Sequence, residues 1–275
     1  MNKTKVKEIL TAFGIFQIVS FFYHLILKIF KKISNKISNT GYILLYHRVD
    51  NLDNDPHQLA VSIENFEAQI KFLSENYNVI SLSKMVDDVK NKRLKDNSVV
   101  VTFDDGYVDN YLNALEILEK YNVPATIFVT SGKVGDNTPF EWDTKNVFDV
   151  NNRCMNEIEL KKMSESKMIK IGSHTVSHPQ LYLLEDINKK KELGESKLQL
   201  EKIINKQVSF FAYPFGGYTV KNDKLVGLVK NANYEAACEN ISGRIQNNSD
   251  VYRLPRFVVR NWDLKEFKRN FKKFV

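Results

Sequence analysis

The 275-residue chain has the length of one α/β barrel with a small appendage, and its 43% hydrophobic content supports a sizeable core. Residues 1–40 hold seven lysines and one glutamate, and these residues account for most of the formal net charge of +7; the rest of the chain holds 33 basic and 32 acidic side chains. A nucleic-acid-binding domain carries its positive charge on the folded surface, so this distribution excludes a nucleic-acid partner. The two cysteines, Cys154 and Cys238, have no paired spacing, which excludes a disulfide framework and a thiolate metal site.

The N-terminal segment is typical of a membrane-associating helix. Ile9–Leu27 is a run of 19 residues without formal charge, flanked on both sides by lysines, and as a helix it would be about 28 Å long, close to a hydrocarbon core of about 30 Å. The segment has no small-x-small cleavage site, which favours a retained anchor over a removable signal peptide. Three polar side chains within it keep an interfacial amphipathic helix and an ordinary extra helix open as alternatives. We therefore expect residues 1–40 to form a hydrophobic helix and linker, and residues 41–275 to form the main domain.

Strand and helix patterns alternate through the main domain, which predicts a parallel sheet covered by helices. Short β-branched or aromatic runs predict strands at Tyr42–Tyr46, Val79–Ile80, Val99–Phe103, Ala125–Val129, Met168–Ile171, Ser209–Ala212, Tyr234–Ala237 and Phe257–Val259. Apolar residues at helical spacing predict helices around Phe66–Leu73 and over Lys84–Val89, Tyr111–Tyr121, Glu157–Ser166 and Asp186–Ile204.

Two adjacent carboxylates end the third predicted strand. Asp104 and Asp105 follow Val99–Phe103, and Gly106 marks a turn. Neighbouring acids at a strand end can point to different sides once the chain turns, so one can bind a cation while the other handles protons. A solvated Asp-Asp-Gly turn is the alternative that this tripeptide alone leaves open.

A pair of histidines about seventy residues later favours the metal-binding interpretation. His174 and His178 are four residues apart, and we expect them to lie on one face of a helical turn. Two imidazoles and one carboxylate are the three protein ligands of an open zinc-type site. Catalytic groups of a (β/α) barrel lie at the carboxyl ends of its strands, so the fold would bring these residues together.

The two motifs, Thr102–Tyr107 (TFDDGY) and His174–His178 (HTVSH), resemble the first two motifs of the polysaccharide deacetylase (NodB-homology) family. The resemblance extends over roughly residues 41–262. It implies a distorted (β/α) barrel that hydrolyses an N-acetyl or similar acyl group on a sugar with a divalent metal. The expected fold class is therefore α/β, a barrel of the polysaccharide deacetylase type preceded by the N-terminal hydrophobic helix.

The same resemblance implies roles for individual residues. Asp105, His174 and His178 would be the metal ligands, and Asp104 would be the general base. A zinc-type ion makes bound water acidic enough for a carboxylate to deprotonate it near neutral pH. Phe211–Gly216 (FAYPFG) is similar to the third motif, in which the backbone N–H of Phe215 would stabilise the oxyanion.

The third motif departs from the family pattern, because Ala212 occupies the position of an arginine that normally orients the base aspartate. Arg256, next to the last predicted strand, is the candidate that could replace it, and Arg48 is a weaker one. Either arginine could instead lie at the surface.

The proton donor for the leaving amine is a second departure. Many family members use a histidine near the C-terminus, but this chain has no histidine after His178. Tyr46–Val49 (YHRV) resembles a branch in which an N-terminal histidine takes that place. His47, with an ordinary pKa near 6.5, is thus the expected general acid, although an isolated histidine is often structural. His24 and His57 are interpreted as incidental.

Aromatic side chains suggest how a sugar could be held. We expect Trp142, Tyr213 and Phe215 to contact substrate, with a core position as the alternative for Trp142.

The predicted function is removal of N-acetyl groups from an envelope or exported polysaccharide, at a membrane-associated location facing the extracytoplasmic envelope. The alternatives are a deacylase of a lipid-linked or small amino sugar, and a non-catalytic carbohydrate-binding barrel. Zinc is the expected metal, although cobalt or nickel would suit the ligands almost equally.

Overall fold

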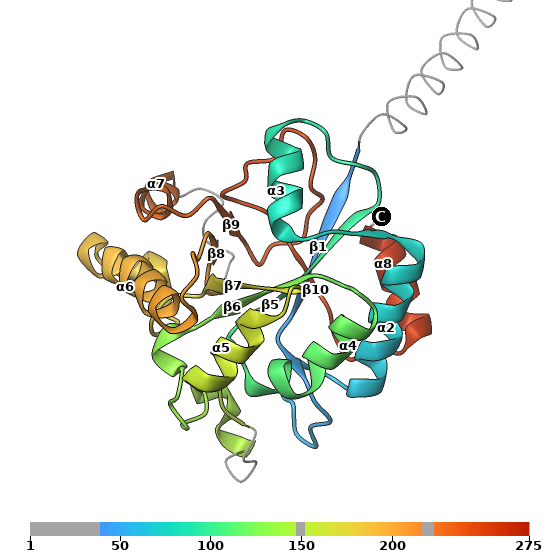
Figure 1. Ribbon diagram of the computed structural model, residues 1–275, viewed down its shortest axis with the longest axis horizontal. Coiled ribbons are helices and arrows are strands. Elements are labelled where there is room, and N and C mark those ends of the chain that lie inside the picture. The colour runs from blue at the N-terminus through green and yellow to red at the C-terminus, as the bar shows by residue number, and fades with distance from the viewer. Residues whose placement is uncertain (1–38, 147–151, 216–222, 275) are drawn as a thin grey trace, which may run out of the picture. The chain divides into compact units, whose positions relative to one another are not determined.

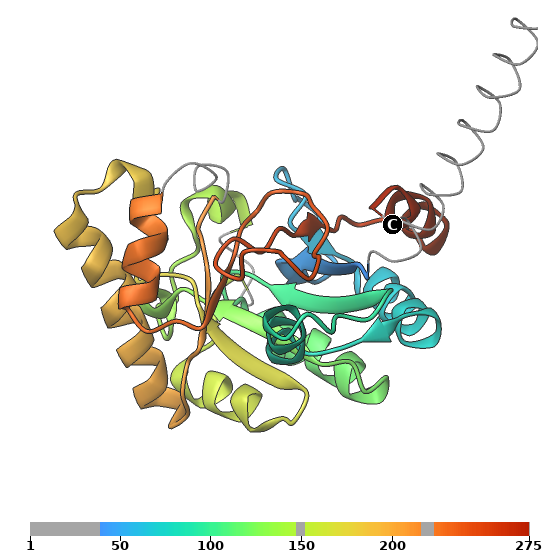
Figure 2. The same ribbon diagram turned by 90° about the horizontal axis from the view of Figure 1, so that it is seen from above.

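Eight parallel strands form the main sheet of the computed structural model, which describes residues 39–146, 152–215 and 223–274 (Figure 1). They are β1 (Gly41–Tyr46), β4 (Asn78–Val79), β5 (Ser98–Phe103), β6 (Ala125–Val129), β7 (Ile169–Ser173), β8 (Phe210–Ala212), β9 (Ala236–Cys238) and β10 (Phe257–Val258). Their order is β10-β1-β5-β6-β7-β8-β9, and β4 pairs with the beginning of β5. The sheet curls into an open barrel, because β9 and β10 do not pair with each other within the described ranges (Figure 2). The predicted barrel fold is confirmed.

Helices connect the parallel strands, because such strands cannot be joined by tight hairpins. They are α2 (Ile63–Asn76), α3 (Leu82–Lys90), α4 (Leu115–Lys120), α5 (Glu157–Glu165), α6 (Asp186–Ile204), α7 (Asp223–Asn231) and α8 (Leu264–Phe274). The predicted strands and the α6 helix agree closely with these bounds. The predicted helix over Tyr111–Tyr121 begins as a π-helical turn, Asn110–Ala114, that continues into α4. The sequence interpretation missed α7 and α8.

The alternation of strand side chains divides the core between the two faces of the sheet. Leu44, Val101 and Ile127 belong to a large cluster that includes residues of α2 and α4–α8. Their neighbours Ile43 and Val100 belong to a second cluster, which includes buried residues of α3. Both faces are therefore covered, which explains why β1, β5 and β6 are buried at every position and largely apolar.

The side chains of the predicted site lie at the carboxyl ends of the strands, along one edge of the sheet. His47 follows β1, Asp104 and Asp105 follow β5, and His174 follows β7. After His47 the chain forms a second, two-stranded sheet from β2 (Arg48–Val49) and β3 (Ala60–Val61). The sheet thus gathers residues that are more than a hundred positions apart in the sequence.

The predicted N-terminal membrane helix lies outside the described residues, apart from positions 39 and 40 of its linker. Thr40–Val275 forms one compact unit. Among the helices that the structure describes, none combines the length and apolarity required to cross a bilayer.

Candidate active site

A cavity of about 260 Å³ opens at the carboxyl edge of the sheet. It is lined by His47, His57, Leu59, Asp104, Asp105, Trp142, His174, His178, Tyr213, Phe215, Asn240, Val258 and Arg260. The fold therefore brings together eight of the nine residues that the sequence predicts for the site. The ninth, Arg256, is fully buried beside Asp104.

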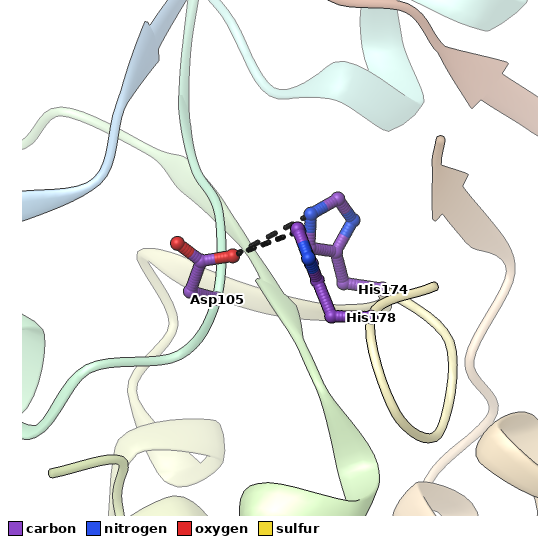
Figure 3. Close-up of side chains that lie close together, drawn as sticks. All are labelled: Asp105, His174 and His178. Carbon is purple, nitrogen blue, oxygen red and sulfur yellow. Dashed lines mark ion pairs between the residues drawn. The ribbon is translucent and has the colours of Figure 1, made fainter. Parts of the chain in front are cut away.

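Asp105, His174 and His178 form the candidate metal centre (Figure 3). Asp105 Oδ1 lies 3.6 Å from His174 Nε2 and 3.5 Å from His178 Nε2. Two ligands of a tetrahedral zinc-type ion lie about 3.4 Å apart, given metal–ligand distances of about 2.0–2.1 Å. The spacing between the carboxylate and each imidazole is thus suited to a shared ion.

The environment of Asp105 also fits a cation. Its Oδ1 is buried and has no hydrogen-bond partner in the described part of the chain. Burial, with the negative charges of Asp104 and Asp143, raises the pKa of Asp105 well above its ordinary value. A bound cation would supply the positive charge that this carboxylate lacks.

Both histidines are prepared to act as ligands, because burial disfavours their protonated forms. Burial lowers the pKa of His174, and burial together with the nearby His174 lowers the pKa of His178 to about 2. His174 Nδ1 lies 2.8 Å from the carbonyl oxygen of Ala212. Donation of the Nδ1 proton to that carbonyl leaves a lone pair on Nε2, the atom facing Asp105.

The expectation of a helical turn between the two histidines is wrong. The chain after β7 forms an irregular loop, in which Thr175 has φ +69° and His178 has φ +57°. Asp105 and Phe215 also have left-handed backbone, with φ +73° and +58°. Such conformations are uncommon for residues other than glycine and are outliers for β-branched or bulky residues such as Thr175 and Phe215, so the surrounding structure must hold this backbone in place.

Asp104 is paired with Arg256 by two parallel hydrogen bonds. Arg256 Nη1 donates to Oδ1 at 2.6 Å and Nη2 donates to Oδ2 at 2.7 Å. Burial alone would raise the pKa of Asp104, but Arg256, with a smaller contribution from His174, lowers it to about 2. Arg48 does not reach Asp104, because its Nε donates to Asp109 at 2.8 Å. The contact expected of the substitute arginine is thus made by Arg256, while its role in catalysis stays a prediction.

His47 lies at the cavity and is half-buried. Burial, partly offset by the charge of Asp104, lowers its pKa to about 4. This pKa is lower than the ordinary value near 6.5 expected from the sequence. The resting imidazole is therefore uncharged at neutral pH. The side-chain amide of Asn110 donates to the main-chain carbonyl of His47 at 2.9 Å and fixes the backbone there.

Aromatic rings form one wall of the cavity. Trp142 is half-buried, stacks on Phe140 with ring centroids 4.5 Å apart, and lies 5.0 Å from the His178 ring. Phe215 is 46% exposed and its ring lies 4.7 Å from that of His178. Tyr213 is only 1% exposed. The two exposed rings are thus better placed to contact a sugar than Tyr213 is.

Tyr213 has a structural contact of its own. Its hydroxyl donates to the main-chain carbonyl of Tyr252 at 3.1 Å. The side chain thereby ties the end of β8 to the segment before β10. Its contribution to substrate binding stays a prediction, as do those of Trp142 and Phe215.

Three polar residues of the cavity were not among the predicted site residues. Asn240 and Arg260 follow β9 and β10, so placing functional groups at strand ends could have found them. His57, interpreted as incidental, lies in the loop between β2 and β3, and nothing in its sequence context indicates the cavity. Arg260 Nη1 donates to the His57 carbonyl at 3.0 Å and holds this loop against the site.

Comparison with known proteins gives three kinds of similarity. Residues 91–237 match the family model described as polysaccharide deacetylase. A Staphylococcus aureus protein named poly-beta-1,6-N-acetyl-D-glucosamine N-deacetylase is 28% identical over 253 residues, covering 83% of this chain and 81% of that protein. The structure of BC0361, a polysaccharide deacetylase from Bacillus cereus, is 26% identical with a TM-score of 0.68 and covers 84% of this chain and 69% of its own. The Streptococcus pyogenes deacetylase PplD in complex with acetate, at 24% identity, shares the fold, with a TM-score of 0.70 over 84% of this chain and 97% of its own.

Proposed function

Because this chain belongs to the polysaccharide deacetylase family, we propose that it hydrolyses N-acetyl groups on amino sugars of an envelope or exported polysaccharide with the help of a divalent metal. The observation that carries the proposal is the grouping of Asp105, His174 and His178 beside the Asp104–Arg256 pair in one cavity. The S. aureus relative, named poly-beta-1,6-N-acetyl-D-glucosamine N-deacetylase, supports this substrate class.

Each group of the site has a task in amide hydrolysis. Asp105, His174 and His178 would hold the ion, which when bound supplies Lewis acidity and lowers the pKa of water. Asp104, kept ionised and oriented by Arg256, accepts the proton of the attacking water. As the carbonyl carbon gains the water oxygen, the main-chain N–H of Phe215 stabilises the negative charge on the carbonyl oxygen.

Cleavage of the carbon–nitrogen bond requires a proton on the leaving nitrogen, because an amide nitrogen expelled as its anion is too basic. His47 is uncharged at rest, and its pKa of about 4 against about 2 for Asp104 means that it holds a proton more tightly. The proton that Asp104 takes from water therefore passes to His47, and we assign to His47 its delivery to the leaving nitrogen. The balance is one amide and one water converted to acetate and a free amine.

Acetate release from defined N-acetylglucosamine oligomers tests the proposal. Wild-type protein should release acetate at a rate that rises with oligomer length, and Asp105→Ala should not. Release from monosaccharides or lipid-linked sugars alone would favour the small-substrate deacylase. Binding of oligomers without acetate release would leave a carbohydrate-binding barrel and overturn the catalytic proposal.

Zinc is the metal we propose, on the strength of a ligand set of two imidazoles and one carboxylate. Measurement of the metal content of the purified protein, followed by reconstitution with zinc, cobalt or nickel, distinguishes the candidates. We further propose a membrane-associated location facing the extracytoplasmic envelope. The uncharged stretch Ile9–Leu27 supports the membrane association, and the proposed envelope or exported polysaccharide supports the extracytoplasmic side.

A further inference from the structure

The loop between the two histidine ligands needs external support. Thr175 is β-branched and has φ +69°, a conformation that such residues rarely adopt, and His178 follows with φ +57°. Strained backbone of this kind persists only where neighbouring contacts hold it. Because His174 and His178 lie at the two ends of the loop, its shape sets the separation of their imidazoles.

One side of the loop is held by the short 3₁₀ turn Ser131–Lys133 after β6. The N–H of Ser131 donates to the Thr175 carbonyl at 3.0 Å, and the N–H of Gly132 donates to the Val176 carbonyl at 2.9 Å. A side chain at Gly132 would come within 2.6 Å of that carbonyl, which explains the glycine. These contacts use the carbonyl groups of Thr175 and Val176, and the N–H of His178 donates to Thr175 Oγ1 at 3.0 Å. The N–H groups of Val176 and Ser177 are left to another partner.

That partner is Glu192, which lies in the second turn of α6. Its Oε2 accepts hydrogen bonds from the N–H groups of Val176 at 2.7 Å and Ser177 at 3.0 Å. Its Oε1 accepts the hydroxyl proton of Ser177 at 2.7 Å. Consecutive N–H groups after a left-handed residue form a concavity that favours an anion, and here one carboxylate fills it.

We propose that Glu192 is a positioning residue for the metal centre: by holding Val176 and Ser177 it fixes the geometry of His174 and His178 and thereby sets the metal affinity. The inference rests on the proposed function, since it takes the ion to be bound by Asp105, His174 and His178. Glu192 does not belong to that ligand set and acts through the loop. Groups that orient metal ligands typically change affinity about 10–100-fold when removed.

The test is a direct measurement of the zinc dissociation constant by competition with a chromogenic chelator, which needs no substrate. Glu192→Ala should bind zinc at least about 10-fold more weakly than wild type. Ser177→Ala removes one of the three hydrogen bonds and should have a smaller effect. Glu192→Gln keeps an oxygen acceptor for the N–H groups and should recover part of the affinity.

Glu195→Ala is the matched control, because Glu195 is an exposed glutamate on the same helix. It should bind zinc as wild type does. Thermal unfolding of the metal-free proteins separates affinity from folding. A merely structural role predicts a lower unfolding temperature without zinc and unchanged affinity in the folded protein.

Wild-type zinc affinity in folded Glu192→Ala would overturn the inference, and so would an equal loss in Glu195→Ala. If Glu192→Ala does not fold, wild-type affinity in both Glu192→Gln and Ser177→Ala would overturn it instead. Failure of the proposed function gives a different result, in which the wild-type protein itself binds no zinc at this site.

Discussion

Replacement of Arg256 by methionine should impair the proposed general base, Asp104, while the Asp104 side chain itself is kept. Arg256 and Asp104 are joined by hydrogen bonds of 2.6 and 2.7 Å, and their side chains are 0% and 4% exposed. Methionine occupies a similar volume but leaves the carboxylate without its cation. Loss of one partner from a buried ion pair costs about 3–5 kcal/mol of stability, so the variant should be destabilised by that order.

The pKa of Asp104 gives the direction of the catalytic effect. Burial raises this pKa and Arg256 is the main group that opposes burial, giving a value of about 2 against an ordinary 3.8. A lowered carboxyl pKa means that the pair stabilises the fold above about pH 4 and that this stability, on the order of 2 kcal/mol, is lost as the pH falls toward 2. Without Arg256 the pKa rises, so the acid limb of the activity profile should move to higher pH.

The assay is acetate release measured from pH 4 to 9, with kcat and KM determined separately. Arg256→Met should lower kcat by about 10²–10⁴-fold, because general base catalysis contributes in that range. Arg256→Lys keeps the positive charge but not the two parallel hydrogen bonds, so its kcat should lie between those of Arg256→Met and wild type. Arg269→Met is the control, since Arg269 forms an exposed pair with Glu266 that contributes little.

The result that refutes this reasoning is a folded Arg256→Met protein with wild-type kcat and an unmoved acid limb. Should that variant fail to fold, the same result in Arg256→Lys would count equally against a bidentate orienting role.

Three further predictions concern the metal, the proton donor and the N-terminal segment. Chelation should abolish acetate release and added divalent ion should restore it; full activity in rigorously metal-free protein would exclude metal dependence. His47→Ala should lower kcat about 10²–10⁴-fold with metal content intact, whereas lost metal would make His47 a ligand or structural residue and wild-type turnover would make it a bystander. Deletion of residues 1–38 should move the protein from the membrane to the soluble fraction with unchanged kcat, and unaltered membrane partitioning would contradict a membrane role for the segment.

The fold was predictable from the sequence because most of its buried strands have a clear pattern of apolar residues. Fully buried parallel strands are near-continuous apolar runs, and β1, β5 and β6 each appear as such a run between polar segments. The missed helix α8 had a weaker signal, since Phe267 and Phe271 are its fully buried apolar residues among many lysines. Their four-residue spacing was the available indication.

The site was predictable to the extent that it follows from strand ends. The rule that functional groups gather at the carboxyl edge places His47, Asp104 and His174 near one another. Loop conformation was not predictable in the same way. A four-residue spacing suits a helix, but hydrogen bonds that the segment donates to Glu192 and accepts from the turn after β6 hold His174–His178 in another shape. Those partners are remote in sequence, and no local pattern indicates them.

Left-handed backbone at Asp105, Thr175, His178 and Phe215 has an evolutionary consequence. Each of these positions would be less strained as glycine, Thr175 and Phe215 most of all, and two of the four are proposed metal ligands. Mutations that abolish catalysis here can therefore make the barrel more stable. Selection for turnover, rather than for stability, is then what keeps these side chains at the site.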